Sequence, residues 1–212
     1  MRATGADSEN TRQRILRHSM AEFAAKGYDG ARVDSIARRC RLSKNMLYHY
    51  FNSKEGLFIA VLENAYETFR ARQRDFVIRG SDPVDAMCRL IAYTFYALLE
   101  NQDVIALLNT ENLHKGRHIR RSRLIRSLYD PLVDTVREIL RRGVTEGVFR
   151  PNIDPVNLYL SLSSLSYNYI SNQYTLKVAF GIDLMTKNRR AIWLAHITDL
   201  ILTYCRSKPR HR

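Results

Sequence analysis

The 212-residue sequence has little of what would indicate a secreted, membrane-spanning or disulfide-stabilised protein. Its three cysteines, Cys40, Cys88 and Cys205, are odd in number and widely spaced, which predicts reduced thiols rather than a disulfide framework. No run of about 18 apolar residues is present, and the polar N-terminus does not resemble a secretory signal. These features predict a cytoplasmic protein that has no membrane partner.

Motifs of enzymes and metal sites are also missing. The sequence contains no GxSxG, HExxH, P-loop or CxxC pattern. His114 and His118 are four residues apart, but Gly116 lies between them, so two surface imidazoles are favoured over a metal site. The prediction is therefore a protein that is not an enzyme, with no catalytic residues, no cofactor and no metal.

Positive charge is in excess and unevenly distributed. Lys and Arg number 34 against 21 Asp and Glu, which gives a formal net charge of +13. Residues 1–54 carry 11 basic and 5 acidic side chains, whereas residues 55–212 carry 23 and 16. The N-terminal quarter is therefore the denser positive region, and it favours a polyanionic partner such as DNA.

Residues 33–58 have the pattern of a helix-turn-helix followed by a third helix. Apolar residues at i, i+3, i+4 and i+7 predict a first short helix with one buried face, formed by Val33, Ile36, Ala37 and Cys40. Ser43 is a suitable N-cap for the second helix, and Ser53 for the third. A helix-turn-helix places its second helix in the major groove of DNA.

Polar side chains dominate the outer face of this second helix and its flanks. Lys44, Asn45 and Met46 are expected to face the bases. The side chains expected to hold phosphates are those of Ser43, Tyr48, His49 and Lys54. For either helix alone a solvated polar face would be the simpler explanation. The combination of helix, turn, helix and displaced positive charge favours a DNA interface.

Residues 11–58 resemble the TetR family of one-component transcriptional regulators, through the segments TRQRIL, AEFAAKGYDGARVDSIA and LSKNMLYHYFNSKEGLF. The resemblance implies an all-α protein of about nine helices. Its three-helix DNA-binding head would span residues 1–54, and a larger body that dimerises and binds a small effector would span residues 55–212. Ala31 and Arg32 stand where the family commonly has hydroxyl side chains, so Arg32 is expected to replace a phosphate contact. Arg41 stands where Gly is usual, and a left-handed conformation there would cost about 1 kcal/mol.

Apolar periodicity predicts that the rest of the chain is also helical. Pro83 is expected to begin one helix, since Pro suits the first helical position. A basic helix is expected to follow Gly116 and to pass through Pro131. The predicted helices cover residues 9–26, 54–79, 83–101, 103–114, 117–147, 155–180 and 188–206.

The final helix carries more apolar surface than one neighbouring helix should need. Its apolar stripe consists of Trp193, Ile197, Leu200, Ile201 and Tyr204. The stripe fits either the core of a monomer or a homodimer interface. The resemblance favours a homodimer, because members of the family pair their last two helices with those of a second subunit.

A small-molecule site is predicted around Glu111, which continues the apolar stripe of the helix at 103–114. A carboxylate on an inward face is costly unless something pairs with it. It is expected to bind an effector, with an aromatic or acidic metabolite as the candidate class, or to pair with an arginine of the basic run 115–126. The residues predicted to line the site are Tyr66, Tyr93, Tyr96, Asn109, Glu111, Asn112, His114 and Tyr167.

Together these features predict a transcriptional repressor that a small-molecule effector releases from a pseudo-palindromic, double-stranded DNA operator. An effector-free DNA-binding protein of the nucleoid or the division site is the alternative with the same fold. The run from Lys115 to Arg126 is interpreted as a solvated helix face, with capture of an anionic effector as the other hypothesis.

Overall fold

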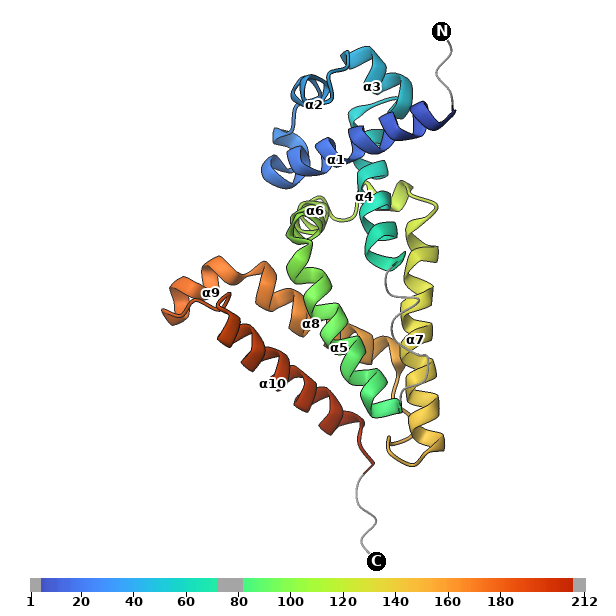
Figure 1. Cartoon of the computed structure of the whole chain (residues 1–212), viewed down its shortest axis with the longest axis vertical. Helices are drawn as coiled ribbons and strands as arrows, with labels where there is room; N and C mark the ends of the chain where they lie inside the picture. The colour runs from blue at the N-terminus through green and yellow to red at the C-terminus, as the bar shows by residue number, and fades with distance from the viewer. Residues whose placement is uncertain (1–4, 72–81, 208–212) are drawn as a thin grey trace, which may run out of the picture. The chain divides into compact units, whose positions relative to one another are not determined.

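The structure, a computed structural model, describes residues 5–71 and 82–207, and within these ranges it is helical with no β-strand (Figure 1). The elements are α1 (Gly5–Gly30), α2 (Val33–Cys40), α3 (Lys44–Phe51), α4 (Lys54–Ala71), α5 (Pro83–Glu100), α6 (Gln102–Leu113), the 3₁₀ helix η1 (Ile119–Arg121), α7 (Ile125–Thr145), α8 (Pro155–Ser171), α9 (Gln173–Phe180) and α10 (Lys187–Cys205). None of the helices in the described ranges is both long and apolar enough to cross a membrane. All three cysteines are free, and burial raises the pKa of the Cys205 thiol to about 11.

The chain divides into two compact units that are not continuous in sequence. The N-terminal unit consists of residues 1–68 and 103–126, and the C-terminal unit of residues 69–102 and 127–212. Helix α6 therefore belongs with the helix-turn-helix rather than with the helices that flank it in sequence. The predicted boundary after residue 54 separates a DNA-binding part from an effector-binding part, not two compact units. This functional division stays a prediction.

The N-terminal unit has one hydrophobic core to which α1, α2, α3, α4 and α6 all contribute. Phe23 of α1 and Phe58 of α4 are fully buried and meet edge to face, with 4.9 Å between ring centroids. Leu107 of α6 is fully buried in the same core. The apolar stripe predicted for the helix at 103–114 is thus buried against the DNA-binding helices.

Gly56 explains how the start of α4 fits against the end of α3. A Cβ at this position would lie 2.2 Å from the backbone oxygen of Phe51, a distance that real side chains do not adopt. The hydroxyl of Ser53 accepts a hydrogen bond from the Gly56 backbone N–H at 2.9 Å, so Ser53 caps α4 as predicted. Glycine is required here because two backbones approach closely.

In the C-terminal unit, α5 packs against α8 and α10. Its buried face is almost entirely apolar and includes Met87, Leu90, Ile91 and Phe95. Asp82 caps α5 by accepting hydrogen bonds from the Val84 and Asp85 backbone N–H groups, and Pro83 is its first residue as predicted.

Two predicted helix boundaries are wrong. The helix predicted at 155–180 is interrupted at Asn172, whose backbone departs from helical geometry with φ −99° and ψ 14°, so α8 and α9 are separate. The basic helix predicted from residue 117 begins only at Ile125, because the chain first forms the short 3₁₀ helix η1, which ends at Ser122 in an extended conformation. The second half of the helix predicted at 54–79, residues 72–79, lies outside the described residues.

Candidate nucleic-acid interface

The turn between α2 and α3 is built by backbone conformation and a side-chain cap. Arg41 ends α2 in the left-handed conformation, with φ 55° and ψ 43°, as predicted for a position where Gly is usual. The Leu42 backbone N–H donates to the Ala37 carbonyl at 3.0 Å. The Ser43 hydroxyl accepts from the Met46 backbone N–H at 3.2 Å, which confirms Ser43 as the N-cap of α3.

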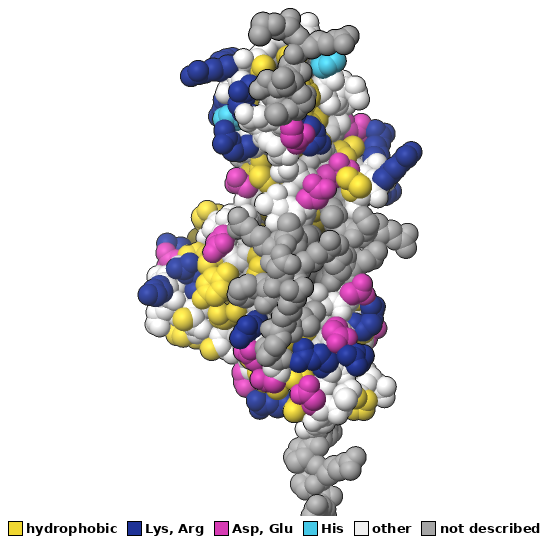
Figure 2. Space-filling model, turned by 45° about the vertical axis from the view of Figure 1, so that its right-hand side comes forward, with side chains coloured by type: hydrophobic (Ala, Val, Ile, Leu, Met, Phe, Trp, Pro, Cys, Tyr) yellow, Lys and Arg dark blue, Asp and Glu magenta, His cyan; other side chains and the backbone are white. Residues whose placement is uncertain are grey.

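Helix α3 has one buried face and one exposed face. Leu47 and Phe51 are buried in the core of the N-terminal unit. Of the residues predicted to contact DNA, Tyr48 and Lys54 are half-buried, and the exposed ones are Arg32, Ser43, Lys44, Asn45, Met46 and His49. Lys and Arg side chains also reach the surface of this unit (Figure 2). The residue types and their exposure suit a DNA groove, and the individual contacts stay predictions.

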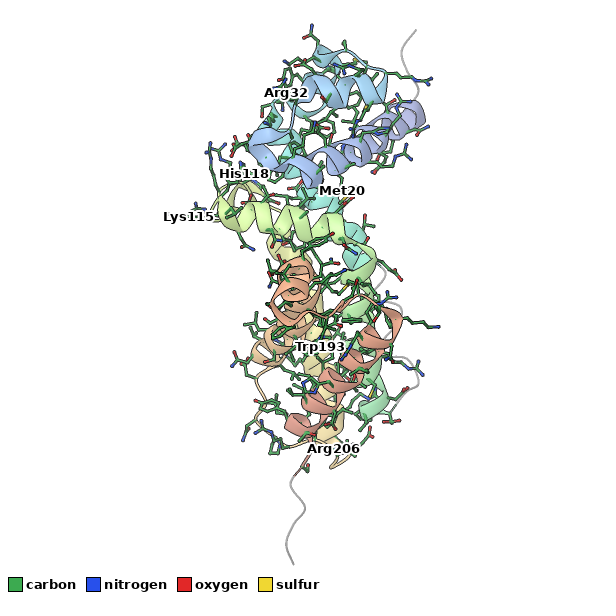
Figure 3. The ribbon with its side chains drawn as sticks, turned by 90° about the vertical axis from the view of Figure 1, so that its left-hand side faces the viewer. Met20, Arg32, Lys115, His118, Trp193 and Arg206 are labelled. Atoms are coloured by element: carbon green, nitrogen blue, oxygen red, sulfur yellow. The ribbon has the colours of Figure 1, made fainter. Side chains whose placement is uncertain are left out.

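The N-terminus of α2 is held by a buried carboxylate that the sequence did not reveal. Arg32 is the N-cap residue, but its side chain makes no capping hydrogen bond (Figure 3). Instead, Oε1 of the fully buried Glu22 lies 3.4 Å from the Arg32 backbone nitrogen and 2.7 Å from Lys26 Nζ. Arg39 of α2 approaches the other oxygen at 3.7 Å. Glu22 therefore ties α1 to α2 at the position where the family commonly has a capping hydroxyl.

Lys54 begins α4 and is fixed by contacts with the end of α1. Its Nζ donates to the Asp29 backbone oxygen at 3.2 Å and lies 4.9 Å from the centroid of the Tyr28 ring. A lysine at a helix N-terminus opposes the helix dipole, and a phosphate there would satisfy both the ammonium and the free N–H groups. These contacts favour the predicted phosphate-binding role of Lys54 because they fix its charge at the start of α4.

A column of contacts runs from Lys54 to α6. The Tyr28 ring, which lies beneath Lys54, is 4.3 Å from the ring centroid of the fully buried His118 (Figure 3). His118 Nδ1 is 2.7 Å from Oε2 of Glu111 on α6. Burial raises the pKa of the Tyr28 phenol, and the Glu55 carboxylate adds to this shift. We call Lys54, Tyr28, His118 and Glu111 the Lys54–Glu111 column.

Glu111 is the most completely bonded side chain of the column. Its Oε1 accepts the backbone N–H groups of His118 at 2.8 Å and Ile119 at 2.9 Å, and Oε2 faces the His118 ring. Among the described side chains, the partners of this carboxylate are backbone N–H groups and His118, not the arginine of the 117–126 run that was the alternative prediction. Gly116 reverses the chain so that backbone donors and His118, rather than an arginine, reach the carboxylate. The prediction that His114 and His118 are both surface imidazoles is wrong for His118, which is fully buried. Nε2 of His114 lies 3.4 Å from Oδ2 of Asp29.

The residues predicted to bind an effector are divided between the two units. In the N-terminal unit Tyr66 and Glu111 are buried, His114 is half-buried, and Asn109 and Asn112 are exposed. In the C-terminal unit Tyr93 and Tyr167 are half-buried and Tyr96 is 45% exposed. A common effector site for these eight residues stays a prediction.

The apolar stripe of α10 that was predicted as the dimer interface consists of buried and exposed residues. Ile197 and Ile201 are 0% and 1% exposed in a single chain, so their assignment to a dimer surface is wrong: both face their own core. Trp193 stacks on Tyr169 of α8, with 4.9 Å between ring centroids (Figure 3). Leu200 and Tyr204, by contrast, are 43% and 48% exposed. Only this outer part of the stripe is available to a second subunit.

Comparison with known proteins decides the family. The model described as "Bacterial regulatory proteins, tetR family" matches residues 15–61, and the model "Tetracyclin repressor-like, C-terminal domain" matches residues 83–201. The chain is 36% identical over 202 residues to the HTH-type transcriptional repressor NicS of Pseudomonas putida, a match that covers 95% of this chain and 94% of NicS. The chain belongs to the TetR family.

Solved structures share the fold of this chain. The putative transcriptional regulator SCO4942 from Streptomyces coelicolor superposes with a TM-score of 0.69 at 25% identity, covering 90% of this chain and 97% of that one. AibR, solved in complex with isovaleryl coenzyme A and operator DNA, superposes with a TM-score of 0.64 at 18% identity over 90% of this chain and 97% of its own. The predicted family, all-α fold and role as a DNA-binding transcriptional regulator are therefore confirmed.

Three residues of the N-terminal unit were not predicted in the roles that the structure gives them: Glu22, Asp34 and His118. Glu22 lies seven residues after the buried Ile15, so it places an acid on the buried face of α1. This was a detectable signal. Asp34 has the position of an ordinary acid in the first turn of a helix, so the sequence does not indicate its contact with Lys44. The contact between His118 and Glu111 depends on the left-handed turn at Lys115 and Gly116, which the sequence does not specify.

We expect Glu22→Gln to destabilise the protein by about 1–3 kcal/mol, because the backbone N–H of Arg32 and the Lys26 ammonium lose a buried charged acceptor. Burial opposes ionisation of Glu22, but the hydrogen bonds from Lys26 and Arg32 outweigh it and lower the carboxyl pKa below its ordinary value of 4.5. A lowered pKa contributes stability that is present above about pH 4.5 and is lost as the pH falls through the folded-state value.

Urea unfolding of wild type and Glu22→Gln between pH 7 and pH 3 measures this contribution. The difference between the two proteins should be largest near neutral pH and should shrink below pH 4.5. Glu146→Gln, at an exposed position, is the matched control and should unfold like wild type at both ends of the range. A Glu22→Gln difference that is constant with pH would contradict a role for the carboxylate charge.

Proposed function

We propose that the protein is a homodimeric repressor that binds a pseudo-palindromic operator and that a small-molecule effector releases it. The match to the repressor NicS over nearly the whole of both chains is the observation that carries this proposal. The exposed, polar outer face of α3 supports it, since every residue predicted to face the bases lies at the surface. Two heads related by a two-fold axis would each place α3 in the major groove of one half-site.

The dimer in this proposal forms through the outer faces of α8 and α10. Large apolar side chains remain exposed along α10 at a spacing of four or eight residues: Ile192, Leu200 and Tyr204. On α8, Val156 and Leu160 are 46% and 52% exposed, also four residues apart. Apolar side chains aligned on neighbouring helices are typical of a helical interface. A second copy of the chain would cover both rows.

The effector in this proposal acts through α6 and the Lys54–Glu111 column. Helix α6 shares a core with the DNA-binding helices, and Glu111 is joined to Lys54 through His118 and Tyr28. A ligand that favours a different position of α6 would shift Tyr28 and move Lys54 away from its phosphate. AibR demonstrates that the fold accommodates both operator DNA and an acyl-CoA. Aromatic carboxylic acids and acyl-CoA thioesters are therefore the first effector classes to screen.

The DNA-binding part of the proposal is tested by selecting duplexes from a random library with the wild-type protein and measuring their affinities by fluorescence anisotropy. Lys54→Ala should weaken binding to selected and scrambled duplexes alike and reduce the salt slope by about 1, because one phosphate contact is lost. Asn45→Ala should instead lower discrimination between the two duplexes by about 1–3 kcal/mol.

His49→Ala serves as a comparison, because His49 is exposed on α3 and predicted to hold a phosphate. It should resemble Lys54→Ala in acting on all sequences, with a smaller effect on the salt slope. A Lys54→Ala effect confined to the selected duplex would contradict the phosphate role. Failure of the wild-type protein to enrich any sequence would contradict the proposed function itself.

A further inference from the structure

An acidic side chain lies on the face that is proposed to meet DNA. Asp34 is the second residue of α2, and its side chain is 64% exposed. Its Oδ2 lies 3.2 Å from Nζ of Lys44, the first residue of α3. A carboxylate beside a polyanion weakens binding unless it contributes something else. The place of Asp34 in the first turn of α2 accounts for an acid there, but not for the contact with Lys44 of α3.

Fold stability does not account for the Asp34–Lys44 pair. Both side chains are about half-exposed or more, at 64% and 46%, and exposed ion pairs stabilise proteins by about 1 kcal/mol or less. An acid in the first turn of a helix also interacts favourably with the helix dipole, but this effect requires no partner on α3. The contact joins two helices whose geometry is already set by the left-handed Arg41 and the Ser43 cap.

The pair changes how Lys44 can interact with DNA. A lysine ammonium has three N–H donors and no fixed direction, so an unpaired lysine binds any nearby phosphate as a point charge. With one donor held by Asp34, two donors remain, and their direction is restricted. The carboxylate also cancels the charge that would draw Lys44 to phosphates. What remains is a directed donor that suits the O6 and N7 acceptors of guanine.

We propose that Asp34 is a specificity-determining residue of this DNA interface, which directs Lys44 to a guanine edge in the major groove and keeps it from phosphates. The inference rests on the proposed operator binding and deepens it by assigning one base preference to one pair of residues. Asp34 acts through Lys44, so it is a positioning residue rather than a residue that must itself contact a base. It lowers affinity for DNA in general and raises discrimination between sequences.

The test compares wild type with Asp34→Asn, which keeps the size of the side chain and removes its charge. The probes are the duplex that wild type selects from a random library and a scrambled duplex of equal length. We expect Asp34→Asn to bind the scrambled duplex about tenfold more tightly, with a salt slope steeper by about 1, because Lys44 gains a phosphate. Discrimination between the duplexes should fall about tenfold, and repeated selection should lose a guanine preference at one position per half-site.

Two further variants separate this role from general electrostatics. Asp29→Asn removes an equal charge from a side chain that is 82% exposed in the same unit and pairs with His114 rather than with α3. It should tighten binding to both duplexes equally and leave discrimination unchanged. In a Lys44→Met background, Asp34→Asn should no longer alter the selected sequence, because the residue through which it acts is absent.

The proposal is overturned if Asp34→Asn behaves like Asp29→Asn, with both duplexes tightened equally and the same guanine selected. It is also overturned if Asp34→Asn changes base preference equally in the Lys44→Met background. Far-UV circular dichroism verifies that each variant is folded. Failure of the proposed function gives a different result, since the wild-type protein would then enrich no sequence at all.

Discussion

Replacing Glu111 with alanine is expected to lower the melting temperature by roughly 6–12 °C, which corresponds to about 3 kcal/mol for a chain of this size. The physical reason is that three donors lose their acceptor at once: the buried backbone N–H and ring of His118, and the half-buried backbone N–H of Ile119. Thermal unfolding followed by circular dichroism measures the change. Glu111→Gln should fall between wild type and Glu111→Ala, because its single oxygen still accepts from the backbone.

Glu100→Ala, at an exposed position at the end of α5, is the matched control and should melt within about 1–2 °C of wild type. The double variant Glu111→Ala/His118→Ala should lose less stability than the sum of the single variants, since each change removes the same contact. If Glu111→Ala melted like wild type and no longer responded to an effector, Glu111 would be a ligand-binding residue and the column would not be structural.

Leu200→Glu is expected to weaken the homodimer by roughly 30-fold or more without unfolding the chain, whereas Ile197→Glu is expected to prevent folding. The two residues are on the same helix, but Leu200 is 43% exposed and Ile197 is fully buried in its own chain. A charge buried without a partner costs several kcal/mol, a large share of the 5–15 kcal/mol that typically stabilises a domain. Sedimentation equilibrium and thermal unfolding distinguish the two outcomes.

Val144→Glu controls for the charge, because Val144 is 40% exposed on α7, away from the α8 and α10 rows. This variant should remain a dimer. Operator binding should weaken in Leu200→Glu along with dimerisation, since one head makes half of the contacts. A Leu200→Glu protein that dimerised like wild type would exclude the outer face of α10 as the interface, whatever the behaviour of Ile197→Glu.

These two experiments address different steps of the proposed mechanism. Dimerisation through α10 determines whether two α3 helices can reach one operator. The Lys54–Glu111 column determines whether a change at α6 can reach a phosphate-binding lysine. Each experiment compares a buried residue, whose replacement unfolds or destabilises the chain, with an exposed residue, whose replacement does not. Stability and function can therefore be measured separately at both places.

The helix-turn-helix was largely predictable because its signals are local. The spacing from Val33 to Cys40, the cap at Ser43 and the left-handed residue at Arg41 each act within a few residues of chain. Such signals determine where a helix begins, ends and buries its apolar side. The break at Asn172 escaped prediction because the apolar pattern continues on both sides of it, and only the backbone conformation reveals the interruption.

The family and the all-α fold could be predicted from the sequence alone, because caps, periodicity and charge are properties of neighbouring residues. The partner of each buried polar group depends instead on tertiary contacts. Glu22 reaches the start of α2 from α1, and Glu111 reaches donors beyond the turn at Gly116. Likewise, periodicity placed Ile197 and Leu200 on one stripe, but packing against α5 and α8 buried the first and left the second exposed. A pattern along one helix defines an apolar face, whereas the positions of the neighbouring helices determine how much of that face is covered.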